Sequence, residues 1–293
     1  MSAFFTLPVS AGAAVRMATA ELRHAGIEEA AALEARLLVA HALGIPKEAI
    51  LSYPEQDFDA PAVECLQGLL HRRLCREPIS HLLGSREFWS LPFRVTPNTF
   101  DPRPDSETLI LAALDHYSDN KTTLRMLDLG TGSGCLLLAL LSEFPYATGL
   151  GVDISKPVLS VAKSNASALG LQRRACFLMG DWGKGINEKF DLIISNPPYI
   201  PGPEIDCLQP EIALYESRIA LDGGIDGLAC YRKLVPDLIH LLQPSGTILL
   251  EVGDGQAKAV ARILTQFGLE VTRVQKDFCG VSRCIVSRLQ RAN

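Results

Sequence analysis

The sequence lacks the signatures of several common protein classes. Its eight cysteines form no CxxC pair and its six histidines no HxxxH or HExxH spacing, so we expect neither a zinc site nor a secreted disulfide scaffold. The longest wholly apolar run, 135–141, is too short to span a bilayer. The start lacks the basic segment of a signal peptide, and no internal repeat is found. We therefore expect a globular cytoplasmic protein.

The chain also lacks an excess of positive charge. Its formal net charge is −5 and its isoelectric point is about 5.7, so its surface gains no general counterion-release affinity for nucleic acid. Apolar residues make up 47% of the sequence and charged residues 21%, which is ordinary for a globular protein. We expect a folded protein that binds neither a membrane nor, directly, a nucleic acid.

The N-terminal part of the sequence predicts only helices. Apolar residues recur at helical spacing through 9–76, where β-branched residues are few. Gly26 and Gly44 mark two helix ends, and a further helix is predicted over 62–76, stopped by Pro78. A small helical bundle is the expected structure.

A different pattern begins after this helical part. Two short β-like pieces, 87–89 and 93–95, with Pro92 between them, fit a hairpin. The next segment, 101–107, contains two prolines and several acidic residues, which suit the first turn of a helix.

Strand-like and helical runs alternate through the rest of the chain. This alternation predicts an α/β fold, in which helices cover both faces of a mostly parallel sheet. We predict helices at 134–143, 156–169, 227–242 and 256–267, and strands at 124–128, 148–153, 175–179, 190–195 and 246–252, with two more within 269–288.

A glycine-rich loop joins the first of these strands to the helix after it. Its residues are Gly130, Thr131, Gly132, Ser133 and Gly134. Glycines there permit a tight turn and let a ligand come close to the backbone, which is typical of a nucleoside cofactor site. By itself, the pattern also fits any dinucleotide-binding fold or a simple strand–helix turn.

Acidic residues near this loop indicate which cofactor binds. Asp153 ends the second strand, 23 residues after Gly130, where an acid can accept both hydroxyls of a ribose. Asp128 would repel a pyrophosphate and suits a cofactor with an ammonium group, which favours S-adenosylmethionine over NAD. Asp181 can accept from an adenine amino group and Trp182 can stack on the ring; a strand-end acid and a core tryptophan are the alternatives.

The motif Asn196-Pro197-Pro198-Tyr199 ends the fourth strand, where ligands bind in open α/β sheets. Asn196 and Pro197 both precede proline, so the backbone is stiff and extended and offers few N–H donors. The Asn196 side-chain oxygen and the Pro197 carbonyl can receive the two hydrogens of a planar –NH2 group, and Tyr199 can stack on its plane. Such positioning matters for an amide nitrogen because its lone pair is delocalised. The alternative is a proline-stiffened turn without chemistry.

Together these motifs resemble those of bacterial peptide chain release factor glutamine N(5)-methyltransferases. The resemblance covers nearly the whole chain and is most specific from Arg86 onward. Family members commonly have threonine where Ser106 stands, and often Glu-Pro where this chain has Glu216-Ser217. The matching segments are 86–89, 102–107, 128–134, 152–153, 181–182, 196–200, 221–228 and 251–256.

The resemblance implies three parts of the chain. The first is a small N-terminal all-α domain, 1–84, which helps to dock a release factor, and the second is a β-hairpin linker, 85–105. The third is a Rossmann-like class I methyltransferase domain, 106–293, with a seven-stranded, mostly parallel sheet. The acidic loop 204–216 is expected to order when the substrate binds.

The resemblance also implies the roles of the site residues. Gly130–Gly134, Asp153, Trp182 and Asn196 would contact S-adenosylmethionine, which becomes S-adenosyl-L-homocysteine. Phe100 is expected to line the same site. Residues 196–199 would hold a glutamine, the one in the Gly-Gly-Gln motif of class 1 release factors, which act in translation termination.

Other activities remain open on the sequence alone. An adenine amino-group methyltransferase acting on RNA or DNA could use the same motif, although the acidic isoelectric point and the lack of a basic target-recognition domain count against it. The one small basic run, Arg72, Arg73 and Arg76, also fits a solvated helix face. Methylation of a ribosomal-protein glutamine would need the same core motifs. A module that binds S-adenosylmethionine without catalysis is opposed by the intact acceptor motif.

Overall fold

The structure, a computed structural model, describes residues 9–290 of the 293-residue chain. These residues form two compact units. The first comprises the chain up to Gly84 together with residues 210–215, and the second comprises Ser85–Gln209 and the chain from Glu216 onward. The predicted hairpin thus belongs to the second unit.

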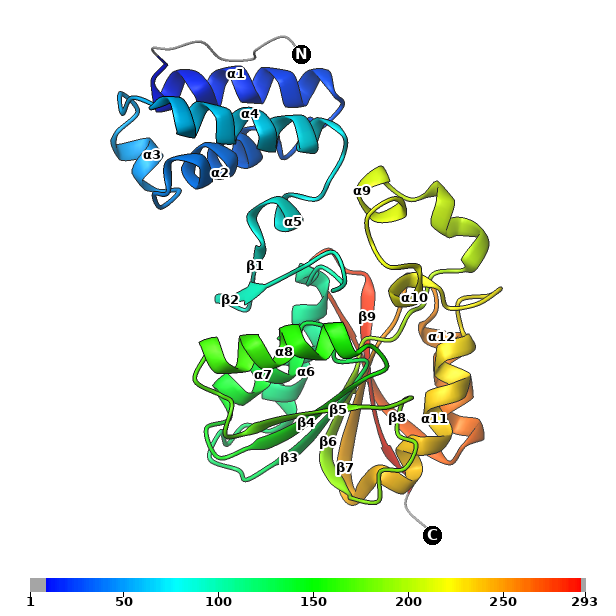
Figure 1. The fold of residues 1–293 in the computed structure, drawn as a ribbon. Helices are drawn as coiled ribbons and strands as arrows, with labels where there is room; N and C mark the ends of the chain where they lie inside the picture. The colour runs from blue at the N-terminus through cyan, green and yellow to red at the C-terminus, as the bar shows by residue number, and fades with distance from the viewer. Residues whose placement is uncertain (1–8, 291–293) are drawn as a thin grey trace. The chain divides into compact units, whose positions relative to one another are not determined.

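The first unit is built from helices, as the apolar spacing predicts. Ser10 and Asp59 cap α1 and α4 by accepting hydrogen bonds from backbone N–H groups of the first turn. Gly44 ends α2 in the left-handed conformation, and Gly26 adopts this conformation just after α1. The helices are α1 (Ala11–His24), α2 (Ala31–Leu43), α3 (Ala49–Ser52), α4 (Ala60–Leu74) and α5 (Ile79–Leu83) (Figure 1).

A short segment from much later in the chain completes this unit. Residues 210–215 include α9 (Pro210–Ala213), and Glu211 Oε1 lies 3.0 Å from both Arg73 Nη2 and Arg76 Nε. Arg73, whose side chain is 4% exposed, also pairs with Glu34 at 2.7 Å. The interpretation of the basic run as a solvated helix face is therefore wrong for Arg73, which is buried and pairs with two carboxylates.

The predicted hairpin opens the second unit. β1 (Ser85–Phe88) pairs antiparallel with β2 (Leu91–Arg94), and Pro92 lies within β2 rather than between the strands. Trp89 and Ser90 form the turn, with φ of 51° and 57°. Two successive positive φ angles are typical of the turns that match the twist of a two-residue hairpin.

A seven-stranded sheet forms the centre of the second unit, in the order β5-β4-β3-β6-β7-β9-β8. β9 is antiparallel to both its neighbours and the other pairs are parallel, so the sheet is mostly parallel, as expected. The strands are β3 (Arg125–Leu129), β4 (Thr148–Asp153), β5 (Ala175–Met179), β6 (Phe190–Ser195), β7 (Leu242–Glu251), β8 (Leu269–Lys276) and β9 (Ser282–Leu289).

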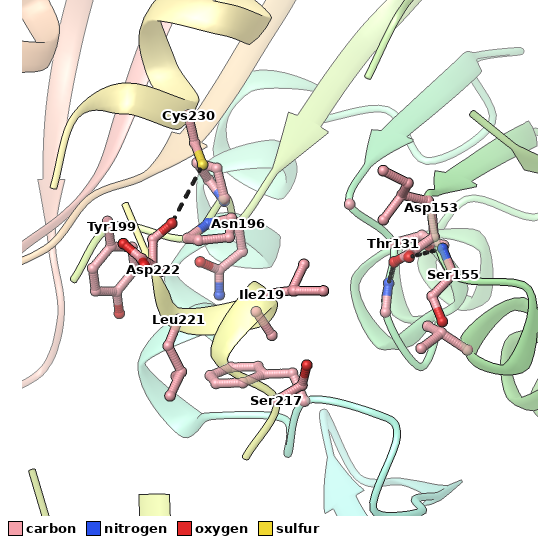
Figure 2. Close-up of a pocket in the computed structure, with 18 of the residues that line it drawn as sticks. Thr131, Asp153, Ser155, Asn196, Tyr199, Ser217, Ile219, Leu221, Asp222 and Cys230 are labelled. Carbon is pink, nitrogen blue, oxygen red and sulfur yellow. Dashed lines mark hydrogen bonds between the residues drawn. The ribbon is translucent and has the colours of Figure 1, made fainter. Parts of the chain in front are cut away.

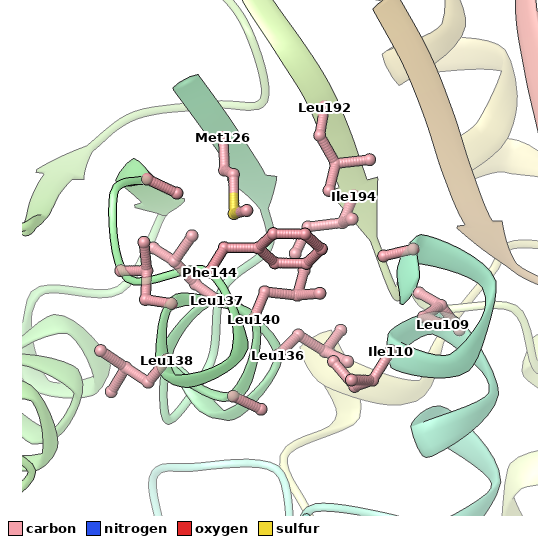
Figure 3. Close-up of a cluster of buried hydrophobic side chains, with 14 of the residues drawn as sticks. Leu109, Ile110, Met126, Leu136, Leu137, Leu138, Leu140, Phe144, Leu192 and Ile194 are labelled. Atoms are coloured by element: carbon pink, nitrogen blue, oxygen red, sulfur yellow. The ribbon is translucent and has the colours of Figure 1, made fainter. Parts of the chain in front are cut away.

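Helices cover both faces of this sheet (Figure 1). Leu109 of α6 and Leu140 of α7 pack with Met126 of β3 and Ile194 of β6 in the core on one face (Figure 3). A second core, with side chains of α11 and α12, lies on the other face. These helices, with α8, are α6 (Glu107–His116), α7 (Cys135–Glu143), α8 (Lys156–Ala168), α11 (Ala229–Leu241) and α12 (Ala257–Gln266).

The strand order reverses between β3 and β6. From β3 the chain moves outward through β4 and β5, and it then returns to β6 on the other side of β3. In open α/β sheets a ligand crevice forms at the carboxyl ends of the strands at such a point. β3, β4 and β6 end at Leu129, Asp153 and Ser195, so the glycine loop and the Asn-Pro-Pro-Tyr turn begin at this crevice.

Within residues 9–290, no helix combines the length and the apolar character that crossing a lipid bilayer requires.

Candidate active site

The glycine loop between β3 and α7 contains three residues in the left-handed conformation. Gly130, Gly132 and Gly134 have φ of 78°, 57° and 82°, which glycine adopts without strain. A Cβ at Gly134 would lie 3.3 Å from the Cβ of Ala162 on α8, so this glycine permits close packing of the loop on that helix. The first four residues of the loop line the pocket described below, whereas Gly134 does not.

Asp128 lies beneath this loop. Its side chain is wholly buried; Oδ2 accepts a hydrogen bond from Thr131 Oγ1 at 2.7 Å, and Oδ1 has no hydrogen-bond partner in the part of the chain that the structure describes. Burial raises the pKa of Asp128 to about 7, while the hydrogen bond from Thr131 lowers it and the charge of Asp153 raises it. The carboxyl group is not part of the pocket wall and lies behind the loop that lines it.

Asp153 fixes the other side of the loop. Its Oδ2 accepts from the backbone N–H of Gly132 at 3.0 Å, and its Oδ1 accepts from that of Ser155 at 2.9 Å. Each carboxylate oxygen has a further lone pair, and Asp153 lines the pocket. The carboxylate is therefore oriented by the backbone and still able to accept ribose hydroxyls.

Asp181 and Trp182 form a wall of the pocket after β5. Asp181 is exposed and pairs with Lys184. Trp182 packs partly against the core, and its ring lies beside the loop, since a Cβ at Gly130 would be 3.6 Å from Trp182 Cζ3. The two interpretations of this tryptophan are thus compatible: it contributes to the core and also faces the pocket.

The Asn-Pro-Pro-Tyr turn is fixed by hydrogen bonds to three side chains from two other segments. Asn196 Nδ2 donates to Ser106 Oγ at 3.1 Å, and the Tyr199 hydroxyl donates to Glu251 Oε1 at 3.3 Å. The backbone carbonyl of Tyr199 accepts from Gln256 Nε2 at 2.8 Å. We did not predict these three partners as site residues, although each lies in a segment that resembles the family's.

One pocket joins the glycine loop to this turn. Its volume is about 710 Å³, within the usual range for small-molecule sites. Figure 2 shows Thr131 and Asp153 on one side of it and Asn196 and Tyr199 on the other. The predicted site residues that line it are Gly130, Thr131, Gly132, Ser133, Asp153, Asp181, Trp182, Asn196, Pro197, Pro198 and Tyr199, together with Phe100.

The sequence reasoning missed a charged cluster beside this pocket. Arg103, which lines the pocket, donates from Nη2 to Glu216 Oε1 at 3.0 Å and lies with its Nη1 3.6 Å from Asp101 Oδ2. Its guanidinium carbon is 5.0 Å from the centre of the Phe100 ring. Burial raises the pKa of Glu216 to about 7, while Arg103 lowers it and Asp101 raises it. Arg103 could have been predicted as a site residue, because the segment 102–107 around it resembles the family's.

These features fit S-adenosylmethionine. A cofactor with an ammonium group, ribose hydroxyls and an adenine ring needs negative potential, hydroxyl acceptors and a flat apolar surface. In the pocket wall, Asp153 offers negative potential and hydroxyl acceptors and Trp182 offers the flat apolar surface, while Asp128 adds negative potential from behind the loop when it is ionised.

Comparisons with known proteins agree with this fit. Residues 13–84 match a family model described as PrmC N-terminal domain, and residues 120–275 match one described as methyltransferase domain. Among solved structures, a ribosomal protein L11 methylase from Lactobacillus delbrueckii subsp. bulgaricus shares the fold, with a TM-score of 0.51 at 18% identity over 68% of this chain and 86% of that one. The expected class I methyltransferase fold is confirmed.

Curated relatives cover most of the chain at much higher identity. A release factor glutamine methyltransferase from Rhodospirillum rubrum is 44% identical over 274 residues, which is 92% of this chain and 82% of the relative. Another, from Caulobacter vibrioides, is 41% identical over 90% of this chain and 91% of its own. On this identity and coverage, and with the matching N-terminal and catalytic domains, the chain belongs to the release factor glutamine methyltransferase family.

Proposed function

We propose that this protein methylates the side-chain amide nitrogen of the glutamine in the Gly-Gly-Gln motif of class 1 peptide chain release factors. S-adenosylmethionine supplies the methyl group, carried on a positively charged sulfur. The observation that carries the proposal is the orientation of Asn196 in the pocket wall. Its amide nitrogen is turned to Ser106, so its oxygen remains as the acceptor for a ligand.

The acceptor turn has the atoms that a glutamine amide requires. An –NH2 group has two donors, and the Asn196 Oδ1 and the Pro197 carbonyl are two acceptors in a stretch where Pro197 and Pro198 lack N–H groups. Tyr199 packs on the plane of the amide, and its hydroxyl bond to Glu251 fixes the ring. Residues 196–199 therefore bind the substrate and align its nitrogen.

This alignment directs the nitrogen lone pair at the methyl carbon. The nitrogen forms a bond to that carbon as the carbon–sulfur bond breaks, and the electron pair of the broken bond stays on sulfur. The nitrogen then loses one proton to solvent. Because the leaving group departs neutral, no general acid is required. Positioning of the reactants lowers the activation barrier by about 7–11 kcal/mol in well-oriented systems.

The other residues of the pocket bind the cofactor in this proposal. The loop Gly130–Gly134 lets the cofactor approach the backbone, and Asp153 accepts its ribose hydroxyls. Asp181 and Trp182 contact the adenine, and Asn196 lies between the cofactor and the glutamine. Support comes from the carboxylate of Asp153, which two backbone N–H groups already orient.

The helical unit has a separate role in the proposal, which is to help dock the release factor. Its family match covers 13–84, which lies outside the part of the chain matched by the methyltransferase domain, 120–275. Since release factors act in translation, the cytoplasm is the proposed location.

Transfer of a labelled methyl group to a purified release factor tests the function. We expect label on the wild-type release factor and none when alanine replaces the glutamine of its Gly-Gly-Gln motif. Equal labelling of that alanine variant would contradict the proposed acceptor. Preferential labelling of RNA, DNA or a ribosomal protein would favour the alternatives instead.

A further inference from the structure

A buried carboxyl group lies behind the acceptor turn and is connected to both of its polar side chains. Glu251, the last residue of β7, is 1% exposed, and its Oε1 accepts from the Tyr199 hydroxyl at 3.3 Å. Ser106, 3% exposed, interacts with the same carboxylate and lowers its pKa, and the other carboxylate oxygen, Oε2, is buried with no hydrogen-bond partner among residues 9–290, so it can accept the Ser106 hydrogen. The Ser106 oxygen accepts from Asn196 Nδ2 at 3.1 Å. Asn196 and Tyr199 are thus linked to one acid.

The direction of these hydrogen bonds follows from the chemistry of each group. An ionised carboxylate only accepts, and a serine hydroxyl has a single hydrogen to give. If Glu251 takes that hydrogen, Ser106 can only accept from Asn196. The nitrogen of the Asn196 amide must then face Ser106, which leaves its oxygen for a ligand.

The opposite orientation of the amide would prevent binding of an –NH2 substrate. The Asn196 oxygen would face the Ser106 oxygen without a hydrogen between them. Its nitrogen would face the pocket, where it would meet the hydrogens of the substrate amide. The two orientations differ by a half-turn about one side-chain bond, so the choice between them needs a determinant.

We propose that Glu251 and Ser106 are positioning residues that set which end of the Asn196 amide faces the substrate. The inference rests on the proposed function, because the acceptor role of Asn196 belongs to it. Glu251 acts through Ser106 and Tyr199 and is set back from the reacting atoms. The pair of residues makes the turn an acceptor for an –NH2 group before the substrate arrives.

The charge on Glu251 controls this arrangement. Burial raises the pKa of Glu251 to about 7; the Ser106 hydrogen bond, the charge of Arg283 and the Tyr199 hydrogen bond lower it, and Asp105 raises it. A protonated Glu251 can donate to Ser106, whose own hydrogen then turns to Asn196 and favours the wrong end of the amide. Transfer should therefore become faster as the pH rises through this pKa. The other titratable groups that interact with Glu251 are Tyr231 of α11, Cys284 of β9 and Cys135 of α7.

Kinetics of three variants and a control test the proposal. Ser106→Ala and Glu251→Gln should lower kcat by about 10- to 100-fold, since misplacing a reacting group by about 1 Å costs on that order. The affinity for S-adenosylmethionine should not change. Ser106→Thr keeps the hydroxyl and should retain most of the rate. Ser287→Ala is the matched control, because Ser287 is also wholly buried and its hydroxyl has no partner among residues 9–290.

The pH profile separates positioning from simple packing. Wild-type kcat should rise with pH near 7, whereas Glu251→Gln should lack this rise. Asp128 and Glu216 titrate in the same range, so the loss of the rise in this one variant identifies the group. Wild-type kcat in both Ser106→Ala and Glu251→Gln, or an unchanged rise in Glu251→Gln, overturns the inference.

A measurement without methyl transfer distinguishes this inference from the proposed function. The side-chain –NH2 signal of Asn196 in ¹⁵N-labelled protein, assigned by its loss in Asn196→Asp, should exchange slowly with solvent and accelerate in Ser106→Ala. Equal exchange in both proteins contradicts the positioning role, whatever the activity. If the Asn196 –NH2 group exchanges slowly in the wild type and faster in Ser106→Ala, the positioning role holds. If that same wild-type protein labels no release factor, the proposed function is refuted.

Discussion

Replacing Gly227 by alanine should displace the acceptor turn while leaving the cofactor side of the pocket unchanged. Gly227 has φ of +73°, and a Cβ there would clash with the carbonyl oxygen of Tyr199 and lie 2.5 Å from Gln256 Nε2. These two atoms are hydrogen-bonded to each other at 2.8 Å. The new methyl group must therefore separate them by moving the turn by about 1 Å, to reach an ordinary contact distance.

Two effects of different size follow from this geometry. An alanine in the left-handed conformation costs about 1–2 kcal/mol of unfolding free energy. The displacement of the turn should in addition lower kcat by about 100-fold, as expected for a misplacement of about 1 Å. Gly268→Ala is the matched control, because Gly268 has φ of +78° and no described atom within 4 Å of its added Cβ. It should lose stability but keep its kcat.

The assay compares the two variants in three measurements. These are the kcat of labelled methyl transfer, the dissociation constant for S-adenosylmethionine by calorimetry, and the free energy of unfolding in urea. Equal kcat values for Gly227→Ala and Gly268→Ala would refute the reasoning. So would a loss of cofactor affinity as large as the loss of kcat, because the perturbation would then not be confined to the acceptor turn.

Three further changes test other parts of the chain. Asn196→Ala should lower kcat far more than the affinity for S-adenosylmethionine; equal losses in kinetics and calorimetry contradict the acceptor role. Arg73→Met should reduce the unfolding free energy in urea by about 3–5 kcal/mol, because it leaves Glu34 as an unpaired and largely buried carboxylate, while Glu211 keeps only Arg76. A loss below about 1 kcal/mol would mean that water replaces the arginine. Glu216→Gln tests linkage: folding raises the pKa of Glu216 from 4.5 to about 7, so the wild type should lose roughly 3 kcal/mol of unfolding free energy relative to the variant as the pH rises from about 4.5 to above 7. Parallel pH curves for the two proteins would contradict this.

The helices and strands were predictable where the sequence pattern that defines them is local. The strands at 148–153, 175–179 and 190–195 have the predicted bounds, because each is a short run next to turn-forming residues. β7 begins at Leu242 rather than 246, since polar residues and Pro244 interrupt its apolar pattern. The order of the strands was not predictable, because in a parallel sheet the sequence of a strand does not show which strands lie beside it after a crossover connection.

The same limit applies to the site. Motifs identified the residues that face the pocket, because glycines and prolines fix local backbone geometry. They did not identify the partners behind them: Ser106 is 90 residues from Asn196, and Glu251 is 52 residues from Tyr199. Arg103 and Glu216 are separated by 113 residues. Each pair depends on how elements far apart in the sequence come together, which only the three-dimensional fold determines.

The return of residues 210–215 to the helical unit has a consequence for synthesis on the ribosome. Helices α1 to α5 are translated by Gly84, but Arg73 meets Glu211 only after 138 more residues have followed it out of the ribosome. Until then, a nascent N-terminal unit has Glu34 alone to balance its buried guanidinium. Its last piece arrives with the segment that follows the acceptor turn, so completion of the helical unit is coupled in time to translation of the catalytic domain.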